Sequence, residues 1–189
     1  MPDNLVEFKA AISNLHFRLR NEINEKWNRV LPFNEEFTDR WEKAKYLGFG
    51  EGSSIYDSSV VMGSVKIGSH CWIGPFTLLD GSGGLIIGDY CHISAGVQIY
   101  SHDTVKWVLS KGKQQYEKNQ TSIGSCCHIG SMSVIVKGVQ IGNHCVIGAN
   151  SFVNKDIPDY SIAVGSPAKI IGNVTIDDSG NAELVYLKK

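Results

Sequence analysis

The chain has 189 residues, of which 42% are hydrophobic and 20% charged, and its formal net charge is −1. This composition is typical of a globular domain, and the near-neutral charge offers no basic surface for nucleic acid. No apolar run approaches the roughly 20 residues that span a bilayer, and residues 1–4 do not resemble a secretory signal. We therefore expect a cytoplasmic protein with no membrane insertion and no nucleic-acid partner.

Residues 1–50 are expected to form a helical segment. Apolar residues recur at spacings of three and four from Leu5 to Ile23, which is the pattern of an amphipathic helix. A second helix is expected over residues 34–47, with Asn34 as its N-cap. We expect these helices to cover the open end of the domain that follows, because an uncovered sheet edge is free to pair with other chains.

Residues 51–172 repeat with a period of six. An aliphatic residue opens each repeat, often followed by glycine, at Ile55, Val61, Ile67, Ile73, Leu79, Ile87, Ile93, Ile99, Ile123, Ile129, Ile135, Ile141, Ile147 and Val153. A small residue usually follows four positions later. This pattern predicts a three-sided coil with six-residue edges, each pointing one aliphatic and one small residue inward. The small set includes Cys71, Cys91, Cys127 and Cys145, which we interpret as core residues rather than metal or redox groups.

Two interruptions break the repeat, and a tail follows it. Two extra residues fall near residues 80–84, and the pattern is lost from about 103 to 121, which predicts a protruding loop. Three edges make a coil of eighteen residues, so a chain that resumes in phase at Ile123 would stack Ile55, Ile73, Ile93, Ile123 and Ile141 in one column. The tail, residues 173–189, has turn residues between two apolar strips and is a possible hairpin.

Three stretches carry a family resemblance: residues 93–103 (ISAGVQIYSHD), 147–158 (IGANSFVNKDIP) and 165–169 (GSPAK). They resemble the hexapeptide-repeat acyltransferases, which include galactoside, maltose and serine acetyltransferases and surface-polysaccharide sugar O-acetyltransferases. The resemblance covers about residues 55–172. It implies a mainly β fold, the left-handed parallel β-helix, assembled as a homotrimer. It also implies acetyl-CoA as cosubstrate, bound between neighbouring prisms, and no metal.

His102 closes the first of these stretches, at the position of the family's catalytic base. Imidazole is suited to removing a hydroxyl proton near neutral pH. The alternative is a solvated corner histidine, which is how we interpret His70 and His144 at the same repeat position. Three acids are candidates to orient the ring, namely Asp80, Asp103 and Glu117, and Asp80 in the neighbouring coil is favoured.

The resemblance also implies two sets of coenzyme contacts. Along the acyl-CoA path these are Ser131 and Ala149. Near the phosphate end they are Asn154, Lys155 and Lys169. Small residues are expected to stack, about 4.8 Å apart, into a groove beside His102 formed by Gly81, Ser101, Ser131 and Ala149. Two positions depart from the family. Gly74 replaces the asparagine that contacts the sugar in the galactoside and maltose enzymes, and Gly172 replaces a second basic residue.

The expected function is acyl-CoA-dependent O-acylation of a sugar or sugar-nucleotide hydroxyl in surface polysaccharide biosynthesis. The main alternative is N-acylation of a nucleotide-linked amino sugar, because an amine is already a nucleophile and several such relatives lack the histidine. A metal enzyme of the γ-carbonic-anhydrase type would need a His-x-x-x-x-His motif, which is absent, and the two histidines that stacking could bring together, His92 and His128, make a poor zinc site. A non-catalytic β-helix scaffold would need neither the loop nor His102.

Overall fold

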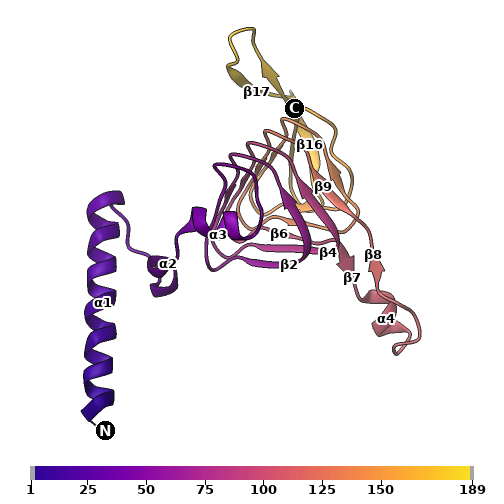
Figure 1. Cartoon of the computed structure of the whole chain (residues 1–189). Coiled ribbons are helices and arrows are strands. Elements are labelled where there is room, and N and C mark those ends of the chain that lie inside the picture. Colours follow the sequence, from indigo (N-terminus) through magenta and orange to yellow (C-terminus); the bar gives the residue numbers. More distant parts are fainter. Residues whose placement is uncertain (1–2, 188–189) are drawn as a thin grey trace.

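The computed structural model describes residues 3–187, which form a parallel β-helix with helices before it and a hairpin after it (Figure 1). Residues 1–2 of the predicted helical segment and 188–189 of the predicted tail lie outside the described residues. Among the described helices, none has the length and apolar character needed to cross a membrane.

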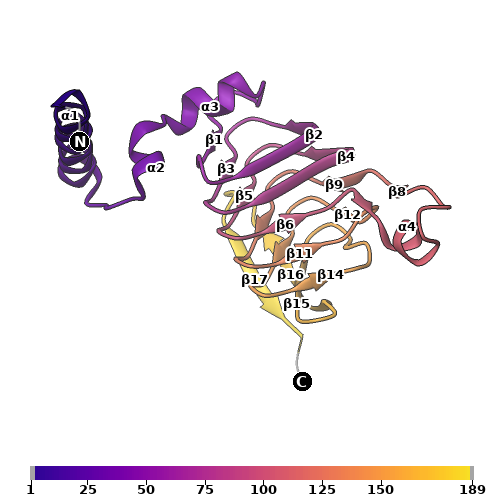
Figure 2. The ribbon, with the colours of Figure 1, turned by 90° about the horizontal axis from the view of Figure 1, so that it is seen from below.

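The β-helix is a triangular prism whose three edges are short parallel strands stacked coil on coil (Figure 2). The first edge consists of β1 (Ser54–Ile55), β3 (Trp72–Ile73), β5 (His92–Ile93), β10 (His128–Ile129), β13 (Val146–Ile147) and β15 (Ser161–Val164). The second edge consists of the first halves of β2 (Val60–Ile67) and β4 (Leu78–Ile87), then β6 (Gln98–Ile99), β11 (Val134–Ile135) and β14 (Phe152–Val153). The third edge consists of the second halves of β2 and β4, then β9 (Thr121–Ile123) and β12 (Gln140–Ile141).

The prism core is built from the repeated aliphatic residues. On the first edge, strand register stacks Ile55, Ile73, Ile93, Ile129 and Ile147, and each of these is fully buried. The predicted column is therefore wrong after the loop, since Ile123 and Ile141 lie on the third edge. The physical reason is that the loop leaves from one corner and returns to the same corner, so the chain continues with the next edge and does not restart the triangle.

The four repeat cysteines are core residues, as predicted. Cys71, Cys91, Cys127 and Cys145 are all buried. Each thiol donates a hydrogen bond of 3.0 to 3.1 Å to a main-chain carbonyl of a neighbouring turn. Among residues 3–187, no cluster of three or more His, Cys, Asp or Glu side chains is arranged to hold a metal ion.

The N-terminal segment forms three helices: α1 (Asp3–Trp27), α2 (Phe33–Phe37) and α3 (Arg40–Tyr46). The single second helix predicted over residues 34–47 is wrong, because Thr38 is extended and breaks it. The N-cap is Asp39, whose carboxylate accepts hydrogen bonds from the N–H groups of Trp41 and Glu42. Asn34 is no N-cap and donates instead to the carboxylate of Asp57.

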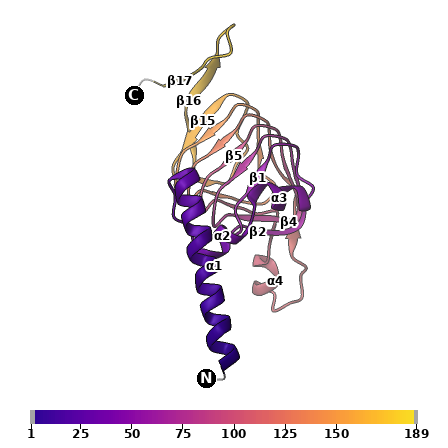
Figure 3. The same cartoon turned by 60° about the vertical axis from the view of Figure 1, so that its left-hand side comes forward.

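The first coil is covered by α2 and α3, which lie beside β1 and β2 (Figure 3), whereas α1 stands clear of the prism (Figures 1 and 2). The buried Glu35 carboxylate accepts hydrogen bonds of 2.8 Å from the N–H groups of Asp57 and Ser58 in the first coil. The Lys43 ammonium donates to the carbonyls of Tyr56 and Asp57, at 3.1 and 2.8 Å. The expected cover therefore exists, but it is made by the two short helices only.

Two excursions leave the prism. The loop predicted near residues 103–121 has a two-stranded antiparallel stem, β7 (His102–Asp103) with β8 (Glu117–Lys118), and it carries the short helix α4 (Val105–Leu109). At the carboxyl end, β16 (Lys169–Ile176) and β17 (Ala182–Tyr186) form an antiparallel hairpin. Figure 1 shows that the loop and the hairpin project from different sides of the prism.

Replacing Lys43 by methionine should weaken the cover of the first coil. The change removes a half-buried cation that bonds two carbonyls, so we expect the free energy of unfolding to fall by about 1–3 kcal/mol. Urea denaturation measures this, with Lys45→Met as the matched control, because Lys45 is an exposed lysine of the same helix. Equal stability of the two variants would contradict this role for Lys43.

Candidate active site

The site centres on a histidine and a carboxylate brought together by the stacking of two coils. His102 begins β7, where the loop leaves the corner between the second and third edges, hereafter the loop corner (residues 80–84, 100–121 and 136–139). Asp80 lies at the same corner one coil away. Its Oδ2 is 2.5 Å from His102 Nδ1, and its side chain is fully buried. Of the three acids that the sequence offered, Asp80 is the one that contacts His102.

The Asp80 carboxylate is held by four hydrogen bonds. Its Oδ1 accepts from the N–H of Ser82 at 2.9 Å, and its Oδ2 accepts from the N–H groups of Ser101 and His102 at 2.9 and 3.1 Å as well as from the His102 ring. Burial alone would raise the pKa of Asp80, but the bonds from Ser82, Ser101 and His102 outweigh it and hold that pKa well below its usual range. Asp80 is therefore ionised at neutral pH.

This contact determines which ring nitrogen of His102 is basic. An ionised carboxylate can only accept hydrogen bonds, so the proton of a neutral ring must lie on Nδ1. Nε2 then carries a free lone pair, and the His102 side chain is 27% exposed, which leaves it accessible to a ligand. The pair has the geometry of an oriented general base, in which the carboxylate fixes the tautomer and stabilises the imidazolium that forms.

Close packing at the loop corner fixes the position at which the stem of the loop begins, at His102. Gly83 donates its N–H to the Ser101 hydroxyl at 2.8 Å, and a Cβ on Gly83 would lie 2.3 Å from the Ser101 carbonyl oxygen. Asn119, which follows β8, donates its N–H to the same carbonyl. A side chain at position 83 would therefore push apart the two chain segments that bracket the stem of the loop.

An ion cluster ties the stem to the next coil. Lys137 lies 3.0 Å from an Asp103 oxygen and 2.7 Å from a Glu117 oxygen, and Lys106 also pairs with Glu117. Hydrogen bonds from Lys106 first and Lys137 second lower the pKa of Glu117 to about 2. The N–H of Val105 and then Lys137 lower the pKa of Asp103. Asp103 and Glu117 therefore hold the loop through Lys137 and do not orient His102.

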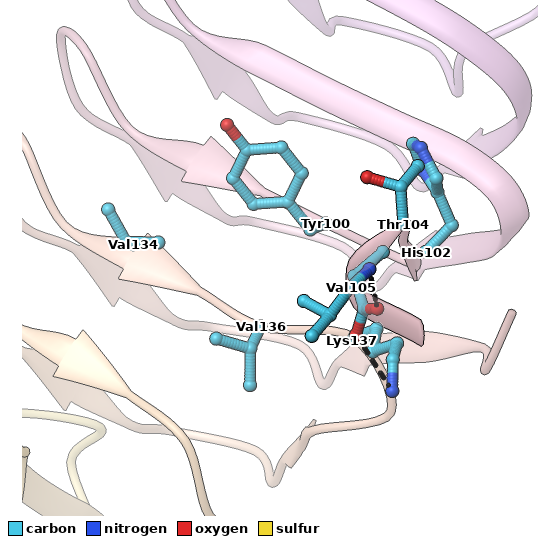
Figure 4. Close-up of a pocket in the computed structure, with 8 residues that line it drawn as sticks. Tyr100, His102, Thr104, Val105, Val134, Val136 and Lys137 are labelled. Carbon is cyan, nitrogen blue, oxygen red and sulfur yellow. Dashed lines mark hydrogen bonds and ion pairs between the residues drawn. The ribbon is translucent and has the colours of Figure 1, made fainter. Parts of the chain in front are cut away.

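Two cavities open on either side of His102, and Thr104 also lines both. The first, hereafter the valine cavity, measures about 480 Å³ and lies against the second edge (Figure 4). Its other lining residues are Tyr100, Asp103, Val105, Val134, Val136 and Lys137. The second, hereafter the loop cavity, measures about 420 Å³ and is also lined by Ser82, Trp107, Tyr116 and Lys118. A histidine that lines two cavities suits a reaction between two substrates.

The predicted coenzyme residues lie at three separate places. Asn154 and Lys155 are exposed and follow β14 on the second edge, two coils from His102, or about 10 Å along the axis at the usual strand spacing. Ser131 and Ala149 stack on each other at the corner between the first and second edges. Lys169 is exposed and begins β16, beyond the last coil.

The predicted groove of small residues is wrong. Gly81 and Ser101 follow second-edge strands, whereas Ser131 and Ala149 follow first-edge strands, so the two pairs lie at different corners. The error has the same cause as the misplaced isoleucine column. With the correct register, the residue that follows Ser101 in its column is Lys137 and the next is Lys155. Sequence reasoning missed Lys137 because of this error, and it missed Trp107, Tyr116 and Lys118 because no repeat places them. Tyr100 follows the repeat residue Ile99, but the repeat alone did not mark it as a cavity residue.

Two parts of the chain match known protein families. The bacterial transferase hexapeptide (six repeats) matches residues 120–155, and the hexapeptide repeat of succinyl-transferase matches residues 64–101. A probable acetyltransferase of Mycobacterium tuberculosis is 31% identical over 123 residues, covering 65% of this chain and 38% of that protein. A chloramphenicol acetyltransferase of Escherichia coli is 34% identical over 137 residues, covering 67% of this chain and 62% of that protein.

Among solved structures, the N-acyltransferase AntD from Bacillus cereus, in complex with dTDP and 3-hydroxybutyryl-CoA, aligns with a TM-score of 0.60. It is 26% identical, and the alignment covers 66% of this chain and 71% of that one. The two matched stretches carry hexapeptide repeats of transferases, and both curated relatives and this solved structure are acyltransferases. The chain spans 38% and 62% of the lengths of the two curated relatives.

Replacing Asp80 by asparagine should destabilise the protein in a pH-dependent way. Because the folded pKa of Asp80 is lowered, its contribution is present above the unfolded pKa of about 3.9 and is lost as the pH falls below that value. At pH 7 we expect the free energy of unfolding of the variant to be lower by about 1.5–3 kcal/mol, the range for hydrogen bonds to a charged group. This gap in the free energy of unfolding between the variant and the unchanged protein should narrow below about pH 4.

Urea denaturation between pH 7 and pH 3.5 measures that gap. Asp178→Asn is the control, because Asp178 is an exposed aspartate at the hairpin turn and should show little difference at any pH. A gap for Asp80→Asn that stays constant down to pH 3.5 would contradict the ionised state assigned to Asp80.

Proposed function

We propose that this protein transfers an acyl group, with acetyl as the simplest case, from coenzyme A to a sugar hydroxyl, and that His102 is the general base. The observation that carries the proposal is the Asp80–His102 pair, whose histidine lines both cavities. The hexapeptide-repeat matches support acyl transfer, and AntD is a structural relative in complex with an acyl-CoA. The cytoplasmic location and the role in surface polysaccharide synthesis stay predictions.

The chemistry follows from the basic Nε2. As the acceptor oxygen attacks the thioester carbonyl, its proton passes to Nε2 and the ring becomes an imidazolium opposite the Asp80 carboxylate. When the tetrahedral intermediate collapses, the carbon–sulfur bond breaks and the thiolate of coenzyme A takes up the proton from Nε2. An oxygen ester and free coenzyme A result, and the histidine is regenerated.

The coenzyme is proposed to lie along the second edge, with its thioester in the valine cavity. That cavity is lined mainly by Tyr100, Val105, Val134 and Val136, which suits the uncharged acyl end of the coenzyme. Two coils farther along the same edge, Asn154 and Lys155 are exposed, and Lys155 suits a phosphate as a point charge. Lys169 is kept as a second phosphate contact.

A homotrimer is proposed because, within one chain, some of the expected coenzyme residues lie at a different corner from His102. Ser131 and Ala149 lie at a different corner from His102, so a neighbouring copy is the simplest way to bring both corners to one ligand. The second-edge face also exposes Val60, Met62 and Phe152, with 36% to 49% of their surfaces accessible. An apolar face of this kind is typical of a protein contact.

N-acylation of a nucleotide-linked amino sugar remains the second candidate, and one observation favours it. AntD is an N-acyltransferase, and it was solved in complex with dTDP. An amine that arrives unprotonated needs little help from a base, whereas a hydroxyl needs its proton removed. The oriented Asp80–His102 pair therefore favours oxygen as the acceptor.

Replacing His102 by alanine should lower the turnover number by about 10²- to 10⁴-fold, the usual effect of losing a general base. The affinity for acetyl-CoA should change only a few-fold, because the proposed coenzyme contacts lie elsewhere. Release of free coenzyme A, measured against a panel of hydroxylated and amino sugars, gives the rate, and calorimetry gives the affinity. His144→Ala is the matched control, since it changes the same repeat position in a coil that has no loop.

The outcome also separates the two candidates. If His102→Ala retains most of the rate with an amino sugar, N-acylation replaces O-acylation as the proposed reaction. An equal loss of acetyl-CoA affinity would make His102 a binding residue and would contradict its role as a base.

Sedimentation velocity at micromolar concentration should give a species of three times the chain mass of 20.7 kDa. The physical reason is the separation of the two corners and the exposed apolar second edge. A monomer at that concentration would contradict the trimer and would leave Ser131 and Ala149 without a role at the His102 site.

A further inference from the structure

The loop cavity has walls from two parts of the chain. Ser82 comes from the prism, His102 and Lys118 come from the stem of the loop, and Trp107 and Tyr116 come from the loop itself. His102 and Lys118 are register partners in the stem, so the histidine and the lysine are fixed side by side. The cavity therefore exists only because the loop folds back beside the catalytic pair.

The aromatic side chains give this cavity its shape. Trp107 is 43% exposed and Tyr116 is 48% exposed, and their ring centroids lie 6.1 Å apart at an angle of 64°. Aromatic rings left half in water gain free energy when an apolar surface covers them. A pyranose presents such a surface through the C–H groups of one face, while its hydroxyls remain free to bond Ser82, Thr104 or water.

The charges around the cavity leave one lysine without a partner. Lys106 and Lys137 are neutralised by Glu117 and Asp103, and Asp80 is bound to His102. Glu117 precedes Lys118 in the same strand, but its carboxylate contacts Lys106 and Lys137 on the other face. Within residues 3–187, Lys118 makes no ion pair, so it is the cation available to a ligand in this cavity.

The two cavities differ in a way that assigns the two substrates. The valine cavity has mostly apolar walls, and its one lysine, Lys137, is already paired with two carboxylates. The loop cavity adds two aromatic side chains, the hydroxyl of Ser82 and an unpaired lysine, none of which lines the valine cavity. His102 lines both cavities. The less polar one suits the thioester, and the other suits a hydroxylated and anionic acceptor.

We infer that the loop cavity is the acceptor site and that the acceptor is a pyranose carrying a phosphate group, with its ring against Trp107 and Tyr116 and its phosphate on Lys118. This inference rests on the proposed acyl transfer at His102 and adds the chemical class of the acceptor. A free sugar phosphate and the sugar phosphate end of a sugar nucleotide share this chemistry.

Direct binding to the full-length protein tests the inference without relying on turnover. The calorimetric probes are hexose 1-phosphates of gluco, galacto and manno configuration, the matching methyl glycosides, inorganic phosphate, and UDP- and dTDP-linked hexoses. At least one hexose 1-phosphate should bind about 10-fold tighter than both its methyl glycoside and inorganic phosphate, which is the size expected for one favourable charged contact. If a nucleotide-linked hexose binds more tightly than the free hexose 1-phosphate, the acceptor is a sugar nucleotide. If the nucleotide adds no affinity, the acceptor is the free sugar phosphate.

Substitutions assign the binding to named side chains. Lys118→Met should remove the 10-fold preference for the phosphorylated sugar, and Lys118→Arg should keep most of it. Lys113→Met is the matched control, an exposed lysine of the same loop that lines neither cavity. Trp107→Ala should weaken binding of the sugar phosphate and of the methyl glycoside alike, and Trp107→Phe should restore it. Leu109→Ala controls for damage to α4, because Leu109 is 78% exposed.

The inference fails if inorganic phosphate binds as tightly as every hexose 1-phosphate, or if Lys118→Met leaves the preference intact. A second measurement separates this failure from failure of the proposed function. If acetyl-CoA binds and a neutral sugar releases coenzyme A in a His102-dependent way, the acyl transfer stands and the anionic acceptor is wrong. If acetyl-CoA does not bind and no acceptor releases coenzyme A, the proposed function fails, and the acceptor role of the loop cavity fails with it.

Discussion

The structure depends on one requirement, that each edge of the β-helix pairs with the coils on either side while keeping its aliphatic residue inside. A residue inserted within an edge would turn the inward side chain outward, because side chains alternate along a strand. Extra chain is therefore tolerated only at corners, and it must return to the corner it left. The loop that begins at His102 obeys this rule, since β6 and β9 follow each other as second and third edges of one coil.

The same requirement places the chemistry. Because the coils stack in register, Asp80 lies next to the point where the loop of the next coil departs, and its carboxylate bonds the main chain at Ser101 and His102 as well as the ring. One buried charge therefore fixes both the start of the loop and the orientation of the histidine. Lys137, one coil farther on, fastens the stem through Asp103 and Glu117. His102 is thus held by the rigid prism, although the loop forms one wall of the loop cavity beside it.

Most of the fold could be predicted from the sequence because the repeat is local: each hexapeptide specifies its own strand and corner. The stacking phase after the loop could not be predicted by counting residues, since an excursion of any length returns to the same corner. This single error misplaced Ile123 and Ile141 and joined Ser131 and Ala149 to the wrong column. The contact of Asp80 with His102 was within reach because both lie on the repeat. The positions of Trp107, Tyr116 and Lys118 were not, because the loop has no periodicity and is fixed by tertiary contacts.

The charge of Asp80 bears on the choice between oxygen and nitrogen as acceptor. A carboxylate and an amide both accept hydrogen bonds from Ser101 and Ser82, so closing the corner does not by itself require an ionised group. The charge matters most when the ring beside it becomes an imidazolium, which happens as a hydroxyl gives up its proton during attack. A neutral amine attacks before it needs to lose a proton, so the imidazolium contributes less to its transition state. A buried carboxylate whose pKa is held low, 2.5 Å from the ring, therefore supports the proposal that the acceptor atom is oxygen.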